Sequence, residues 1–346
     1  MAVDASMVEL FKSNLELCKV GPGQTVAVLS EGEVRADYAQ AFLAASQQLG
    51  ASAFQVNVPS QTAHGGYVGN VGQTALGGNQ AAIDALKGAD IVIDLMLLLF
   101  SDEQTEITDS GTRMLLVVEP MEVLTRMFPT EALRRRVEFG QQRLKEAKVM
   151  RITSPAGTDV TYQLGAYPVM TEYGFTDEPG RWDHWPSGFL FTGGADDGVD
   201  GTVVLNPGDV ICAFRRYVQT PVKFTIERGY VSDVHGDGLD AALLKNYMSG
   251  FDQKAFAISH IGWGLNEKAD WHHMAVADPH KEIGVDALAY YGNVLFSTGP
   301  NTELGGTNNT PCHVDMPLRN CTLALDGDVI VENGDIVVPE MRAAVA

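Results

Sequence analysis

Short apolar runs alternate with helical stretches over the first half of the chain, and this alternation constrains the fold more than any other feature. The expected order is strand 26–30, helix 34–49, strand 53–58, helix 79–87, strand 91–96 and strand 115–118. Such an order is typical of a parallel sheet with helices on both faces. We therefore predict an α/β N-terminal domain over residues 1–150, closed by a helix over 129–148.

The pattern of expected elements changes after residue 150. Short β-rich runs are there separated by Gly, Pro and Asp, with turn-rich connectors near the C-terminal end. A chain of 346 residues also exceeds the size that one core usually serves. We predict a second, α+β domain over residues 151–346, which carries the metal site described below.

Charge and apolar patterning exclude several classes of partner. The chain has 24 Lys and Arg against 44 Asp and Glu, a net charge of -20, which disfavours nucleic acid. Its longest apolar run, 91–100, is interrupted by Asp94 and is too short to span a membrane. The first 18 residues have amphipathic spacing rather than the pattern of a signal peptide, and four dispersed cysteines fit no disulfide framework. We expect a cytoplasmic protein with no nucleic-acid or membrane partner.

The turn after the first expected strand argues against a dinucleotide. It reads LSEGEVRAD, which places Glu31 and Glu33 where a phosphate would lie and lacks the required glycines. Phosphate-binding loops of the Walker type, Gly-x-Ser-x-Gly elbows and His-Glu-x-x-His motifs are also absent from the sequence. Nicotinamide, kinase and common hydrolase chemistries are therefore not expected.

The most informative short motif is His313-Val-Asp315. In an extended segment, residues i and i+2 project to the same face, so this imidazole and carboxylate can converge on one cation. Two histidines and one carboxylate on one face of an Fe(II) ion leave positions for substrate and O2. Taken alone, the pair is a weak signal, and a histidine hydrogen-bonded near a turn Asp is the favoured interpretation.

A third ligand must come from another part of the chain. His260 ends an expected strand just before a Gly-rich turn, a position where ligands commonly lie. The adjacent pair His272 and His273 is the alternative, although its charged surroundings favour an exposed segment.

A second concentration of unusual residues is Trp182-Asp-His184-Trp185. This segment is either a buried corner or part of an active site. In the second case Asp183 or a backbone group would orient the His184 ring, and His184, with an ordinary pKa near neutrality, would move protons.

Longer strings carry a family resemblance over essentially the whole chain. EYGFTDEPGRWDHWPSGFLFT, ISHIGWGLN and YGNVLFSTGPNTELGGTNNTPCHVDMPLRN resemble the 2,5-dihydroxypyridine 5,6-dioxygenases, relatives of the M29 aminopeptidases of the aminopeptidase T type. The resemblance implies a mononuclear non-haem Fe(II) dioxygenase that opens the C5–C6 bond of 2,5-dihydroxypyridine. Both atoms of O2 would enter the product, N-formylmaleamate, in nicotinate catabolism.

The resemblance also implies roles for residues. One Fe(II) per chain would be bound by His260, His313 and Asp315, and His184 would be the general acid or base. Substrate polar atoms would be held by Glu172, Tyr290 and Ser297, although a Tyr290 that only packs is an equally good interpretation. Phe100 would line the substrate where the family has a histidine, so a proton-handling or substrate-binding group of the family is missing there.

Two positions separate the dioxygenase from the peptidase pattern. Where the aminopeptidases have a metal-binding Glu, this chain has His260, and Leu295 stands where they have a histidine that binds the second metal. The rival interpretations are an M29-like aminopeptidase with two metals and a non-catalytic binding protein. For the dioxygenase, we expect a small aromatic N-heterocycle and O2 as partners and a homo-oligomeric assembly.

Overall fold

The structure, a computed structural model, describes residues 4–60, 71–72, 74–278, 281 and 283–344. Backbone contacts divide the chain into two compact units. Unit 1 is formed by Met1–Gly66, Gly72–Pro129 and Glu172–Pro186, and unit 2 by Tyr67–Val71, Thr130–Thr171 and Ser187–Ala346. No helix of the described residues is long and apolar enough to cross a lipid bilayer.

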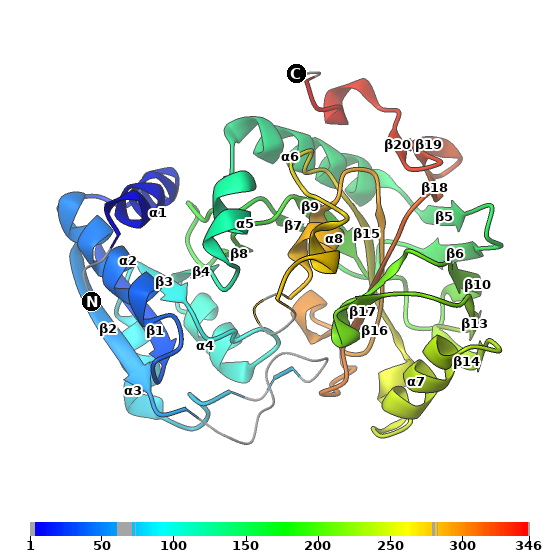
Figure 1. The fold of residues 1–346 in the computed structure, drawn as a ribbon, viewed down its shortest axis with the longest axis horizontal. Coiled ribbons are helices and arrows are strands. Elements are labelled where there is room, and N and C mark those ends of the chain that lie inside the picture. Colours follow the sequence, from blue (N-terminus) through cyan, green and yellow to red (C-terminus); the bar gives the residue numbers. More distant parts are fainter. Residues whose placement is uncertain (1–3, 61–70, 73, 279–280, 282, 345–346) are drawn as a thin grey trace. The chain divides into compact units, whose positions relative to one another are not determined.

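Unit 1 contains a parallel sheet with strand order β2-β1-β3-β4-β8 (Figure 1). Its strands are β1 (Thr25–Glu31), β2 (Ser52–Val58), β3 (Ile91–Asp94), β4 (Arg113–Leu116) and β8 (Trp182–His184). Its helices are α1 (Ala5–Leu17), α2 (Ala36–Gln48), α3 (Gln80–Lys87), α4 (Asp102–Asp109) and α5 (Met121–Arg126).

The central strands of this sheet are buried on both faces. The middle five residues of β1 and all residues of β3 and β4 are inaccessible, as expected for parallel strands covered on two sides. Ala27 and Leu29 of β1 pack into one cluster with Ile83 of α3 and Ile107 of α4. Helix α2 packs on β1 and β2 and stacks Phe42 on Phe11 of α1. The predicted α/β architecture is confirmed.

The boundaries of the compact units differ in two places from the predicted domain boundary at residue 150. That boundary stays a prediction. Helix α6 (Glu131–Glu146), capped by the Thr130 hydroxyl, belongs to unit 2 and not to the parallel sheet. Strand β8 returns to unit 1 because it pairs with β4, Leu116 opposite His184.

Unit 2 contains an eight-stranded sheet with order β14-β13-β10-β6-β5-β18-β19-β20, whose strand pairs are antiparallel (Figure 1). Its strands are β5 (Val149–Thr153), β6 (Asp159–Gln163), β10 (Val199–Leu205), β13 (Val222–Glu227), β14 (Tyr230–His235), β18 (Thr322–Leu325), β19 (Asp328–Glu332) and β20 (Asp335–Ile336).

A five-stranded sheet in the order β17-β16-β15-β9-β7 runs mainly through unit 2 and carries the candidate metal ligands. Its strands are β7 (Met170–Glu172), β9 (Phe189–Thr192), β15 (Ile258–Gly264), β16 (Val294–Thr298) and β17 (Val314–Leu318). The remaining elements are the pair β11 (Val210–Ile211) and β12 (Arg216–Tyr217), helices α7 (Leu239–Met248) and α8 (Val285–Ala289), and the 3-10 turns Cys212–Phe214, Gln253–Phe256, His273–Ala275, Thr302–Leu304 and Pro339–Met341. The predicted mixture of strands and helices after residue 150 is confirmed.

Candidate metal centre

His260, His313 and Asp315 converge in unit 2. One ligand atom from each lies within 4.8 Å of the other two, and all three side chains are buried. Asp315 Oδ1 is 3.2 Å from Nε2 of His260, and its Oδ2 is 3.1 Å from Nε2 of His313. Both imidazoles therefore present the same nitrogen to one carboxylate.

An irregularity in β15 sets the position of His260. The pairing of β15 with β16 shifts register between Ile258 and Ile261, so His260 lies where a regular ladder is interrupted. Such bulges turn a side chain out of the regular alternation and occur beside active sites. The Ser297 hydroxyl takes the place of the lost ladder bonds: its Oγ accepts from His260 N at 2.9 Å and donates to His260 O at 3.1 Å.

Gly299 permits the close approach that places His313. Its φ is +117°, and a Cβ there would lie 2.0 Å from the carbonyl oxygen of Cys312 and 3.0 Å from Cα of His313. A side chain would force the two backbones apart. His313 directly precedes β17, in which Asp315 pairs with Ser297 of β16.

The three side chains are coupled electrostatically. Burial would raise the pKa of Asp315, but the adjacent His313 and His260 rings hold it well below its usual range. Burial would likewise lower the pKa of His313, and Asp315 outweighs this and raises it. A carboxylate flanked by two imidazole nitrogens is thus kept ionised.

Glu303 is a nearby group that the sequence analysis did not select. It lies in the 3-10 turn Thr302–Leu304 of the β16–β17 connection, within electrostatic reach of His260 and His313, and burial raises its pKa. Its Oε1 is buried and has no hydrogen-bond partner among the described residues. Its place in the segment that leads to His313 is the feature of the sequence that could have identified it.

An aromatic ring packs against one of the imidazoles. The Phe191 ring of β9 lies 4.8 Å from the His260 ring, centroid to centroid, and the two histidine rings are 5.3 Å apart. Leu295 is buried in β16 opposite Gly262 and Pro317. Within the described part of the chain, this is the one group of three or more ligand-type residues close enough to hold a metal ion.

The donor set fits a divalent transition metal. It offers two imidazole nitrogens and one carboxylate oxygen and contains no thiolate, a combination typical of non-haem Fe(II) sites with open positions. The alternative ligands His272 and His273 are not members of the group. His272 is 80% exposed and lies 3.7 Å from Asp270.

His184 lies in unit 1, at the carboxyl end of β8. It is in register with Leu116 of β4 and, through it, with Asp94 of β3, at the edge of a parallel sheet where ligands usually bind. Its side chain is 5% exposed, and Nε2 has no hydrogen-bond partner among the described residues. The Glu172 carboxylate is 4.0 Å from Nδ1, beyond hydrogen-bond distance.

Burial lowers the pKa of His184 to about 3, which corrects the expectation that it titrates near neutrality. A neutral imidazole is the form present at physiological pH. One of its ring nitrogens can therefore accept a hydrogen bond.

Asp183 does not orient the His184 ring, so the prediction of this role for Asp183 was wrong. Neighbouring residues of a strand point to opposite faces. The buried Asp183 carboxylate instead accepts from the backbone N–H groups of Tyr173 at 3.0 Å, Gly174 at 2.8 Å and His184 at 2.8 Å, and pairs with Arg181 at 2.6 Å. It is a structural anchor for the segment that precedes β8.

Phe100 is half-buried in the segment that follows β3. This segment is held by Asp94, whose carboxylate accepts from the backbone N–H of Met96, Leu97 and Leu98. Phe100 has a φ of +62°, which is uncommon for a residue with a large side chain.

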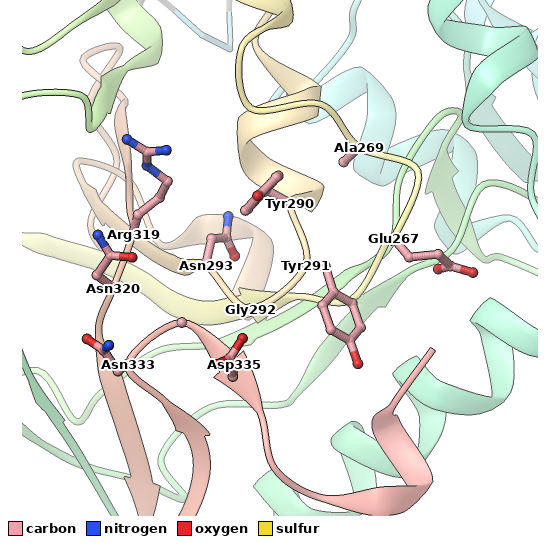
Figure 2. Close-up of a pocket in the computed structure, with 11 residues that line it drawn as sticks. Glu267, Ala269, Tyr290, Tyr291, Gly292, Asn293, Arg319, Asn320, Asn333 and Asp335 are labelled. Carbon is pink, nitrogen blue, oxygen red and sulfur yellow. The ribbon is translucent and has the colours of Figure 1, made fainter. Parts of the chain in front are cut away.

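Tyr290 packs edge-on against Trp271, with ring centroids 5.1 Å apart. It lines a pocket of about 420 Å³ together with Arg319, Asn293 and other polar residues, which are drawn in Figure 2. None of the three candidate metal ligands lines this pocket.

Comparisons with known proteins were consistent with one another. A sequence profile of the family described as NicX, 2,5-dihydroxypyridine 5,6-dioxygenase, matches residues 6–338. The 2,5-dihydroxypyridine 5,6-dioxygenase of Pseudomonas putida KT2440 is 47% identical over 99% of this chain and 99% of its own.

Solved structures extend the comparison. The structure of the Pseudomonas putida KT2440 2,5-dihydroxypyridine dioxygenase matches with a TM-score of 0.95 and 46% identity, covering 99% of this chain and 100% of that one. Wild-type AmpT from Thermus thermophilus matches with a TM-score of 0.66 at 13% identity, covering 97% of this chain and 100% of its own. The second likeness shows a shared fold.

Proposed function

The chain belongs to the 2,5-dihydroxypyridine 5,6-dioxygenase family, and we propose that it catalyses the reaction of 2,5-dihydroxypyridine with O2 to give N-formylmaleamate. The observation that carries the proposal is the convergence of His260, His313 and Asp315, two imidazoles and one carboxylate, within 4.8 Å of one another.

We propose one Fe(II) per chain as the cofactor of these three residues. Bound there, iron would supply positions for a substrate oxygen and for O2. Leu295 supports a single metal because a buried leucine offers no ligand at the place where the peptidases bind the second one.

The chain's own residues would prepare the site in three ways. Ser297 would hold the His260 backbone, because its hydroxyl already bonds both the N–H and the carbonyl oxygen of that residue. Its proposed role is therefore to position His260 and not to bind substrate. Phe191 would exclude water from the imidazoles. His184 would accept a proton from the substrate at its buried Nε2, with Glu172 near Nδ1.

Phe100 and Glu172 stay candidates for substrate contact. Tyr290 is a weaker candidate, because it packs on Trp271 and lines a pocket without the metal ligands. A homo-oligomer and a cytoplasmic location remain part of the proposal, the latter because the four cysteines are free and buried.

Oxygen uptake tests the function. The iron-loaded protein should consume one O2 per 2,5-dihydroxypyridine, with loss of the aromatic absorbance, and anaerobic samples should show neither change. Elemental analysis of anaerobically prepared protein should give one iron per chain. Two zinc ions per chain with hydrolysis of aminoacyl substrates would indicate the peptidase, and the absence of oxygen uptake would indicate a binding protein.

A further inference from the structure

A pocket in unit 2 lies at the opposite end of the strands that carry the metal ligands. His260 is the third residue of β15 and Asp315 the second residue of β17, whereas the pocket residues Glu267 and Arg319 follow the ends of these two strands. Arg319 lies four positions after Asp315, which is about 13 Å of extended chain. The pocket is therefore distinct from the metal centre.

Arg319 is a cation in this pocket. Its guanidinium stacks on the Trp271 ring at 4.9 Å from the centroid, and its buried Nε has no hydrogen-bond partner among the described residues. The Asp209 carboxylate lies within electrostatic reach and accepts from the Arg319 backbone N–H at 3.0 Å. No ion pair joins the Arg319 side chain to a residue that the structure describes. Stacking occupies the flat face of a guanidinium and leaves the N–H edge available for a carboxylate.

The remaining polar groups are suited to the other end of a ligand. Asp335 is an exposed carboxylate that makes no ion pair with the described residues, whereas the Glu267 carboxylate is occupied by Arg136. The side-chain amides of Asn320 and Asn333 line the same space and can both donate and accept. Figure 2 shows Arg319 and Glu267 on opposite sides of the pocket.

The pocket is a defined part of the fold. Its floor is the contact of two turns: a Cβ on Gly292, whose φ is +81°, would lie 1.9 Å from the carbonyl oxygen of Gly334. Asn293 is held by three bonds, donating to Ala287 O and Leu288 O and accepting from Gly264 N. The volume of about 420 Å³ lies within the range of small-molecule sites.

We propose that this pocket binds a small organic acid that carries an amide, with its carboxylate on Arg319 and its amide N–H toward Asp335. A dicarboxylate would place a second negative charge near Asp335 and bind more weakly. The proposal goes beyond the dioxygenase function and does not depend on it, because none of the metal ligands takes part.

Isothermal titration calorimetry of the iron-loaded protein with succinamate tests the site. We expect saturable binding of one succinamate per chain, weakened at least tenfold in Arg319→Gln. The matched control is Arg151→Gln, which removes an exposed arginine paired with Asp159 on the surface of β5 and should leave binding unchanged. Unaltered binding in Arg319→Gln, or no binding in the wild type, would refute the proposal.

Two further measurements keep the outcome decisive. His260→Ala, which removes a metal ligand, should still bind succinamate; loss of binding there would assign the ligand to the metal centre instead. Because Asp335 is exposed, Asp335→Asn should fold even where Arg319→Gln does not. The wild type should prefer succinamate to succinate, and this preference should disappear in Asp335→Asn; a preference unchanged by the substitution would contradict the assigned orientation.

Discussion

His260 differs from His272, the alternative ligand, in what surrounds its ring. Its Nε2 faces the Asp315 carboxylate at 3.2 Å in a buried site, whereas the exposed His272 lies 3.7 Å from the half-exposed Asp270. A ligand nitrogen that is already oriented by the fold binds a metal without a large ordering cost.

His260→Ala should therefore lose iron and oxygen-uptake activity together. His272→Ala is the matched control, because it removes an imidazole beside a carboxylate from an exposed position. Metal content after anaerobic loading and desalting measures the effect. Full iron occupancy in His260→Ala with loss in His272→Ala would reverse the assignment of the third ligand.

His184 is expected to act in catalysis without binding the metal. In His184→Asn, iron content should be unchanged, while kcat falls by about 10²- to 10⁴-fold, the usual contribution of a positioned acid or base. Turnover within about threefold of the wild type, in protein that keeps its iron, would remove His184 from the mechanism.

The burial of His184 also predicts a dependence of stability on pH. Its pKa is lowered to about 3 in the folded chain, while the unfolded chain retains an ordinary value near about 6.5. Between these values the unfolded state binds more protons, so this residue's contribution falls as the pH falls, by at most about 1.4 kcal/mol per pH unit. Urea unfolding at pH 6.5 and 5 should show a smaller loss in His184→Asn than in the wild type; equal losses would contradict a buried neutral imidazole.

At the scale of elements, the connection from β16 to β17 positions His313 through one close approach. Gly299→Ala would place a methyl group 2.0 Å from the Cys312 carbonyl oxygen, whereas the positive-φ Gly305 in the same connection has open space around its Cα. Both substitutions carry a strained φ, at a cost of about 1–2 kcal/mol. Only the first also displaces the backbone before His313.

Gly299→Ala should consequently lower both the free energy of unfolding and the iron affinity, and Gly305→Ala should lower the stability slightly and leave iron binding intact. Denaturant unfolding of the metal-free protein and competition with an iron chelator measure the two effects. Equal behaviour of the variants would show that the approach of Gly299 to Cys312 does not position the ligand.

The elements also show what local sequence can predict. The spacing of His313 and Asp315 follows from the period of two in an extended chain; Asp315 lies in β17, and His313 directly precedes this strand. The role of Ser297 could not be read in the same way, because it depends on a register shift between β15 and β16, strands about forty residues apart in the chain. His260 was selected from its place near the end of an expected strand, and the pairing between distant strands explains how it is held.

The same limit applies to β8 and Asp183. The segment around Trp182 contains turn residues and has no apolar run long enough to indicate a strand. Its strand forms because β4 presents an unpaired edge, with Leu116 opposite His184. Such a partner is set by the fold of the whole chain and not by the three residues themselves.

At the scale of the whole molecule, the discontinuity of unit 1 has a consequence for fragments. The residues of β4 are fully buried, and their outer hydrogen-bonding edge is covered by β8, which arrives from Glu172–Pro186. A fragment of residues 1–150 would keep β1 to β4 and lose this cover. An exposed edge of apolar residues promotes association between chains.

We therefore expect fragment 1–150 to aggregate or to unfold without a cooperative transition. The matched comparison joins residues 1–129 to 172–186 through a flexible linker, which restores β8 and the Asp183 anchor to the segment Tyr173–Gly174. This second fragment should be monomeric and unfold in one urea transition, as judged by ultracentrifugation and circular dichroism. If fragment 1–150 were instead the cooperative monomer, the domain boundary at residue 150 would hold, and the pairing of β4 with β8 would contribute little to the stability of the parallel sheet.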